Sequence, residues 1–127
     1  MPKFTGRYVI DLDASAKLHI GYFTDRFEMK PGYERAMQKY MRTHGEVAKK
    51  ISLTLDRENL RLKTADEEEI FPVKSLVEDG DKPQLVVLAA GRFSMTYDLR
   101  ELGPDLVQFS NHKYDLHNWA WRRTSEV

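Results

Sequence analysis

Residues 85–110 decide the fold; they read LVVLAAGRFSMTYDLRELGPDLVQFS. The nearly continuous apolar run Leu85–Ala90 passes through a tight connection into Phe93–Leu99, where apolar and polar residues alternate. Gly103-Pro104-Asp105 then turns the chain into Leu106–Ser110. Short apolar or alternating runs joined by such short turns are typical of antiparallel strands. This stretch therefore predicts three consecutive strands of a meander.

The same pattern continues on both sides of this stretch. The predicted strands are residues 6–12, 51–55, 60–64, 70–77, 85–90, 93–99, 106–110 and a last strand that carries Trp119 and Trp121 before Arg122-Arg123. Long crossovers are missing from 51 onward, which argues against a parallel sheet. Closing the meander removes two exposed edges, so the sequence predicts a mostly β fold, an eight-stranded antiparallel meander β-barrel. An α+β helix-grip fold is the alternative, but it needs a long C-terminal helix where this chain has Trp-rich strand sequence.

Two helices are expected between the first and second strands, over about residues 15–48. The first covers Lys17–Phe27 and is capped by Asp13 or Ser15. The second begins at Pro31, which suits a first helical turn. Its apolar stripe consists of Tyr33, Met37, Tyr40, Met41, His44 and Ala48. This spacing predicts an amphipathic helix that docks one face on the barrel.

Composition limits the function. The chain has 127 residues, no Cys, and 20 basic against 20 acidic residues, for a net charge of +0. This predicts one domain over 1–127 and argues against nucleic-acid binding and against disulfides or thiol catalysis. No apolar run approaches the roughly 20 residues of a membrane span. Residues 1–6 carry no basic-then-apolar leader, so a cytoplasmic protein is expected, with a trimmed leader left open. The oligomeric state is not indicated.

The order of Gly6-Arg7-Tyr8, a helical insertion, a meander and a closing Trp-Arg-Arg resembles the lipocalin-like (calycin) superfamily, especially small bacterial domains. In lipocalins the first strand carries Gly-x-Trp, and a late basic residue packs across that Trp. The resemblance implies that Gly6 and Tyr8 close the barrel base with Arg122 or Arg123. The related fatty-acid-binding proteins place two helices over the mouth and hold a carboxylate with Arg-x-Tyr on the last strand. Residues 119–122 do not reproduce that motif.

A barrel of this kind implies a small hydrophobic or amphipathic ligand under a helical lid. The candidate ligand-lining residues are Tyr33, Met37, Tyr40, Met41, His44, Phe93, Met95, Tyr97, Trp119 and Trp121. Each also has a structural interpretation, because the helical stripe docks the helix and the aromatic side chains can fill the barrel. The second helix carries an excess of basic residues, which either attracts an anionic head group or forms a solvated face. A filled barrel that acts as an interaction or scaffold module is therefore the second hypothesis.

An enzyme on the same barrel is the third hypothesis. His44 or the segment His112–His117 would supply its acid–base group, and His112, Asp115 and His117 are weighed as metal ligands. Asp11 and Asp13 form a possible carboxylate pair at the end of the first strand. The sequence lacks a phosphate-binding Gly loop and a Gly-x-Ser-x-Gly motif. It thus gives no positive argument for catalysis, a cofactor or a metal.

Overall fold

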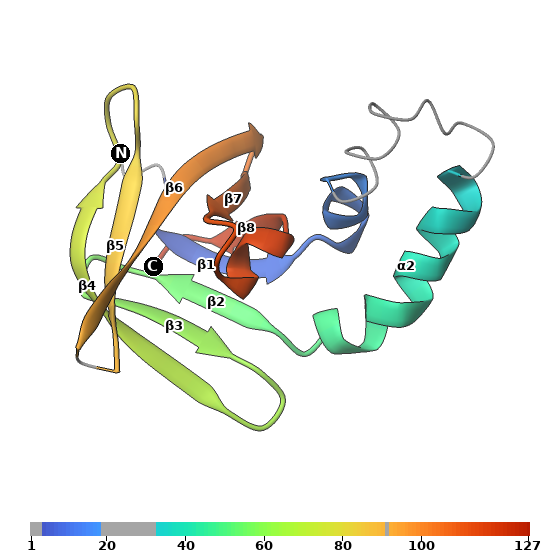
Figure 1. Ribbon diagram of the computed structural model, residues 1–127, viewed down its shortest axis with the longest axis horizontal. Coiled ribbons are helices and arrows are strands. Elements are labelled where there is room, and N and C mark those ends of the chain that lie inside the picture. The colour runs from blue at the N-terminus through green and yellow to red at the C-terminus, as the bar shows by residue number, and fades with distance from the viewer. Residues whose placement is uncertain (1–3, 19–32, 91) are drawn as a thin grey trace.

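The computed structural model describes residues 4–18, 33–90 and 92–127, and this part of the chain forms a closed eight-stranded barrel (Figure 1). The strands are β1 (Gly6–Ile10), β2 (Ser52–Leu55), β3 (Asn59–Lys63), β4 (Glu68–Val77), β5 (Gln84–Ala89), β6 (Phe93–Gly103), β7 (Leu106–Ser110) and β8 (Trp121–Ser125). Each strand pairs antiparallel with the next, and β8 returns to pair with β1. The predicted antiparallel meander barrel is confirmed.

Helices occupy the connection between β1 and β2, as predicted. Residues 12–18 are helical, and α2 spans Tyr33–Ala48. The first helix begins earlier than expected, because the Asp11 Oδ1 accepts the Ala14 N–H at 2.9 Å and so caps the helix. The prediction that Asp13 or Ser15 is the cap is wrong, since both lie inside the helix. Residues 19–27 of the predicted first helix, and Pro31, fall outside the described residues.

The last connection also departs from the prediction. A short 3₁₀ helix, η1 (Asp115–Asn118), follows β7, and β8 begins only at Trp121. The Trp121 indole N–H donates to the Leu116 carbonyl at 3.2 Å. This hydrogen bond holds η1 against the start of β8. Trp119 therefore lies outside the strand, and the prediction that both tryptophans share one face of the last strand is wrong.

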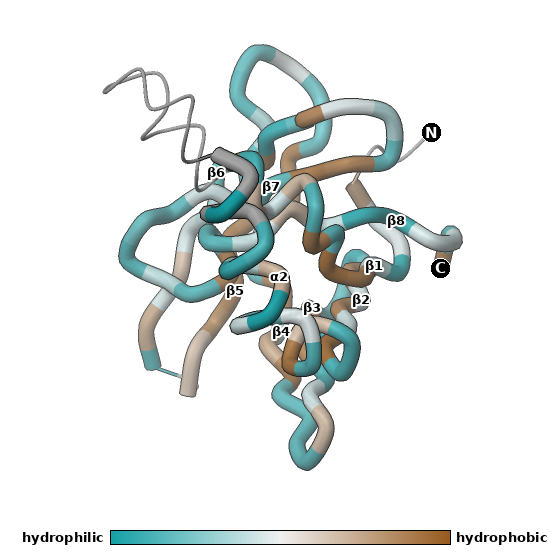
Figure 2. Tube along the Cα trace, turned by 90° about the vertical axis from the view of Figure 1, so that its right-hand side faces the viewer, coloured by the Kyte–Doolittle hydropathy of each residue, from teal (hydrophilic) through white to brown (hydrophobic). Residues whose placement is uncertain are grey.

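Strand register determines which side chains point into the barrel. Tyr8 pairs with Leu53, Leu85 with Tyr97, and Val87 with Met95. All of these side chains are buried, and they belong to one apolar cluster inside the barrel. Apolar stretches alternate with polar ones along the tube in Figure 2, and the turns are mostly hydrophilic. This alternation is what a barrel with an apolar interior and a solvated exterior requires.

Successive connections of an antiparallel meander lie at alternating ends of the barrel. Phe4 and the β2–β3, β4–β5 and β6–β7 turns share one end, which we call the sealed end. The helical connection, the β3–β4 and β5–β6 turns and η1 share the other end, which we call the mouth. Figure 1 shows the helices on the mouth side, opposite the β4–β5 turn and the C-terminus.

Candidate functional site: the barrel mouth

The sealed end is built around Gly6 and Arg123. A Cβ at Gly6, where φ is +154°, would lie 2.5 Å from the Arg123 Cδ and 2.9 Å from the Ser125 carbonyl oxygen. The Arg123 guanidinium donates to Asp105 at 2.7 Å and to the Thr5 carbonyl at 3.4 Å. The hydrogen bond to Asp105 raises the pKa of Arg123. Of the two arginines considered for closing the base, the one that lies across Gly6 is Arg123.

Arg122 points elsewhere and forms an ion pair with Asp11 on the outside of the barrel. Asp11 thus caps the first helix and ties it to β8 at the same time. Asp13 is exposed on that helix, so the two aspartates do not form a carboxylate pair at a strand end.

Two buried polar groups complete the sealed end. The Tyr8 hydroxyl donates to the Phe4 carbonyl at 2.5 Å, and burial raises the pKa of Tyr8 to about 12. The buried Glu78 carboxylate accepts the Phe4 N–H at 3.3 Å and lies 3.3 Å from the Arg57 guanidinium. Phe4 is itself only 1% exposed, so the N-terminal segment covers this end of the interior. Access to the interior is therefore to be sought at the mouth.

Aromatic rings fill the middle of the barrel. The Phe109 ring lies edge-on to Tyr8, Tyr97 and Trp121, with centroid distances of 5.8, 6.3 and 6.4 Å. Edge-on contacts at these distances are favourable for aromatic pairs. Trp121 is fully buried here, so it belongs to the packed core and not to an open surface.

Above this core, exposure rises along β6 toward the mouth. Tyr97, Met95 and Phe93 follow one another on the inward-facing row of β6, and their exposed fractions are 2%, 8% and 55%. The register supports this orientation, because Phe93 pairs with the buried Ala89. Half-buried apolar side chains from other elements also pack against the core cluster: Leu12, Ile51, Leu62, Phe71, Val73, Leu76, Tyr114 and Trp119. The inner wall of the mouth is thus apolar and partly open to solvent.

The carboxyl-terminal part of α2 contacts this mouth. The His44 ring lies 5.7 Å from Trp119 and 4.6 Å from Tyr40, measured between ring centroids. A Cβ at Gly45 would lie 3.7 Å from Leu12, so the α2 backbone passes close to the first helix, residues 12–18, at this point. Ala48 is buried in the core cluster. The helix is therefore anchored by its last turns.

Other residues of the predicted stripe do not share this contact. Met41 is 37% exposed, while burial raises the pKa of Tyr40, which is half-buried. Tyr33 and Met37 lie in α2, but their side chains are outside the described part of the structure. The structure thus brings together His44, Tyr40 and Trp119 from the predicted ligand residues.

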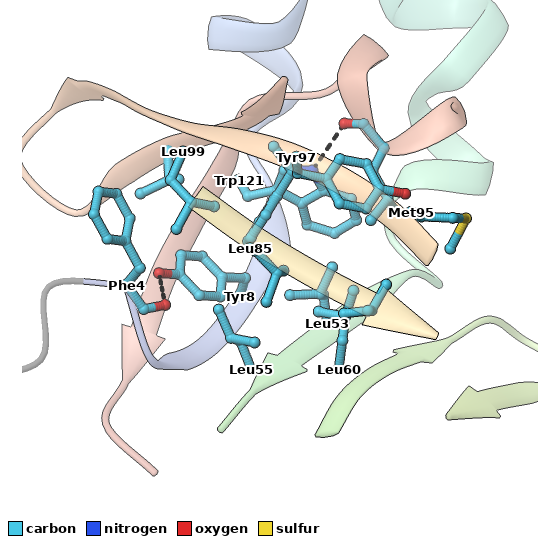
Figure 3. Packing of buried hydrophobic residues seen from close by; sticks show 14 of the residues in the cluster. Phe4, Tyr8, Leu53, Leu55, Leu60, Leu85, Met95, Tyr97, Leu99 and Trp121 are labelled. Carbon is cyan, nitrogen blue, oxygen red and sulfur yellow. Dashed lines mark hydrogen bonds between the residues drawn. The ribbon is translucent and has the colours of Figure 1, made fainter. Parts of the chain in front are cut away.

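The Tyr97 hydroxyl is the polar group at the floor of the mouth. Figure 3 shows it beside Met95, on the side away from Phe4 and Tyr8. Within the part of the chain that the structure describes, this hydroxyl forms no hydrogen bond, although Tyr97 is only 2% exposed. Its ring lies 5.6 Å from Tyr114, a residue that the sequence pattern did not indicate. Burial, with smaller contributions from Tyr114 and Asp115, raises the pKa of Tyr97 to about 12.

A hollow of about 420 Å³ lies on the outside of the barrel, and two of the predicted His residues line it. These are His112 and His117, and the His117 Nδ1 is 3.4 Å from the Ser110 hydroxyl. Burial lowers the pKa of His117, and His112 and Arg100 lower it further. Among the described residues, no group of three or more His, Asp or Glu side chains is placed to hold a metal ion. Asp115 does not line this hollow.

A hollow of about 240 Å³ lies at the mouth end, between the last turn of α2 and the β3–β4 turn. Another, of about 300 Å³, lies between the first helix and the chain around the β6–β7 turn. None of these three is lined by a buried residue of the core cluster. No helix in the described ranges is both long and apolar enough to cross a membrane.

Comparison with known proteins identifies no similar family, protein or structure: no protein-family model matches the chain, and neither a curated protein nor a solved structure does.

Proposed function

We propose that this protein is a lipocalin-like barrel that binds a small apolar or amphipathic molecule at its mouth, beneath the end of α2. One observation carries the proposal. Along the inward row of β6, exposure rises from 2% at Tyr97 through 8% at Met95 to 55% at Phe93. Exposed inward-facing apolar side chains at one end of a barrel favour a ligand that would cover them.

The sealed end supports this location. Phe4, Tyr8 and Glu78 are buried together there, and Arg123 lies across Gly6. A barrel sealed at its base and apolar at its mouth has one route of entry. The same closing geometry is what the lipocalin resemblance implies, so it also favours that family.

The helix contact supports a lid. His44 and Trp119 meet where α2 reaches the barrel, and Tyr40 extends the aromatic surface along the helix. Aromatic rings with polar edges suit an amphipathic molecule, because they offer apolar area and a hydrogen-bonding rim.

The two tryptophans allow a direct test, because they are the only two in the chain and lie in different environments. Trp121→Phe leaves Trp119 at the mouth as the sole reporter, and Trp119→Phe leaves Trp121 in the core. We expect apolar ligands to quench or blue-shift Trp119 emission saturably and to leave Trp121 emission nearly unchanged. Organic extraction of the purified protein, followed by mass spectrometry, identifies any stoichiometric ligand that co-purifies.

A filled barrel that serves as an interaction module is the second candidate. The edge-on packing of Phe109 with Tyr8, Tyr97 and Trp121 favours it. So does the lining of the three hollows, which includes no buried residue of the core cluster. An empty extract together with a silent Trp119 across a panel of fatty acids, retinoids and haem would support this candidate and overturn ligand binding.

A further inference from the structure

We infer that the mouth selects amphipathic molecules with an uncharged hydrogen-bonding head, a hydroxyl or a carbonyl, which Tyr97 binds. This inference rests on the proposed function and specifies its ligand class. It follows from the two tyrosines inside the barrel and from the charges that surround the mouth.

The hydroxyls of Tyr8 and Tyr97 differ in their hydrogen bonding. Both residues are nearly fully buried, at 1% and 2% exposure. Tyr8 satisfies its hydroxyl at the sealed end by donating to Phe4. Tyr97 directs its hydroxyl toward Met95 and the mouth, without a hydrogen-bond partner among the described residues (Figure 3).

The Tyr97 hydroxyl is not among the fully buried polar atoms that lack a partner, so its oxygen still meets solvent at the floor of the mouth. A ligand head that hydrogen-bonds to this hydroxyl would take the place of that solvent. The Tyr97 hydroxyl lies at the inner end of the apolar row that Met95 and Phe93 continue to the rim. A ligand whose body lies along this row would bring its inner end to the hydroxyl.

The charges near Tyr97 favour a neutral head group on the ligand over an anionic one. Tyr114 and Asp115 are the groups whose charge acts on Tyr97, and neither is a cation. At the rim, Glu69 pairs with Leu62, which in turn pairs with the buried Leu53, so Glu69 lies on the inward-facing row. Glu69 and Asp115 are both exposed, so solvent screens their repulsion, but neither group that acts on Tyr97 is a cation that could compensate an anionic head for its lost hydration.

The basic residues of α2 do not change this result. Arg35, Lys39 and Arg42 are all exposed. A cation in water cannot compensate a carboxylate buried at the floor of the mouth, because solvent screens their attraction. A neutral phenol, in contrast, both donates to and accepts from an alcohol or a carbonyl.

The test compares octanol with octanoate at about pH 8, where octanoate is ionised. Binding is read from Trp119 emission in the Trp121→Phe background. We expect octanol to bind at least about tenfold more tightly than octanoate. Tyr97→Phe should weaken octanol binding about fivefold, the value of one hydrogen bond. Tyr8→Phe removes the same atom at the sealed end and should leave octanol affinity unchanged.

The outcomes separate the two proposals. If octanoate binds as tightly as octanol, or if Tyr97→Phe does not weaken octanol binding, the inference about the head is wrong and the ligand site stands. If neither compound changes Trp119 emission, the ligand site itself is wrong. The comparison of octanol with octanoate needs no substitution at Tyr97, so it decides the matter even if Tyr97→Phe fails to fold.

Discussion

Arg123 on β8 pairs with Tyr8 on β1, and its side chain extends over Gly6, where it leaves no room for a side chain. A Cβ there would approach the Arg123 Cδ to 2.5 Å and the Ser125 carbonyl oxygen to 2.9 Å. The arginine side chain can move, but the Ser125 backbone is held by pairing with β1. Strand pairing and the Arg123–Asp105 hydrogen bond thus depend on the same glycine.

Gly6→Ala should therefore destabilise the protein by about 1–3 kcal/mol, the usual cost of overpacking a tight site. Gly103→Ala is the matched control, because a Cβ there has open space and φ is not in the positive range. Urea unfolding at neutral pH measures both free energies of unfolding. Equal losses for the two variants would show that the Gly6–Arg123 contact is not tight.

A second prediction concerns Ser15, which joins the first helix to the chain before β8. Its hydroxyl accepts the Ala120 N–H at 2.8 Å and donates to the Asp11 carbonyl at 2.7 Å, and the residue is fully buried. Ser15→Ala leaves a buried N–H unpaired, which costs about 1–3 kcal/mol. Thr43→Ala is the control, since its hydroxyl bonds only within exposed α2. We expect that control to stay within about 0.5 kcal/mol of wild type; a similar loss in both would contradict the role of Ser15.

The strands of this fold can be predicted from the sequence, but the helix cap and the position of Trp119 cannot. Alternation and turn residues predicted the barrel because both act over a few residues. The cap cannot be chosen from the sequence, because Asp11, Asp13 and Ser15 are all good capping residues. In the structure the Ser15 hydroxyl bonds to Ala120, which is distant in the sequence. Alternation alone predicts a strand at Trp119, because period two cannot detect the 3₁₀ helix that precedes β8.

The candidate site was only partly predictable for the same reason. The inward row of β6 follows from period two, so Phe93, Met95 and Tyr97 could be named from the sequence. That the Tyr97 hydroxyl lacks a described partner while Tyr8 has one depends on which backbone groups other strands bring near. Tyr114 reaches Tyr97 from an irregular connection, where no periodicity exists to indicate it.

Acid stability should depend on Asp11. Burial raises its pKa, but the Ala14 N–H and the Arg122 guanidinium together lower it below the ordinary value. A carboxyl with a lowered folded pKa stabilises the protein above its unfolded pKa of about 4, and this contribution is lost as pH falls through the folded pKa. Asp11→Asn keeps a capping side chain but removes the charge, so stability should fall at pH 7 and change less toward acid than in wild type.

Urea unfolding from about pH 7 to about pH 3 tests this, with Asp13→Asn as the exposed control. The control should follow the wild-type curve throughout. If Asp11→Asn shows the same acid dependence as wild type, the ion pair with Arg122 contributes nothing to acid stability.

Alkaline stability should depend on Tyr8 and Tyr97. Burial raises both pKa values to about 12 from the ordinary value of 10. For a group that is neutral when protonated, a raised folded pKa stabilises the fold below pH 10, and this contribution is lost as pH rises from 10 through 12. After allowance for solvent screening, each tyrosine accounts for at most about 2 kcal/mol of this loss.

Titration of tyrosinate absorbance, with circular dichroism at each pH, measures the effect. Of the six tyrosines, we expect Tyr8 and Tyr97 to ionise last and together with unfolding. Tyr8→Phe and Tyr97→Phe should each remove one late ionisation and extend the folded range toward higher pH. Because Tyr8 also donates to Phe4, Tyr8→Phe should cost stability at neutral pH, whereas Tyr97→Phe should cost little or none. Ionisation of all six tyrosines near pH 10 in a still-folded protein would mean that neither hydroxyl is buried in solution.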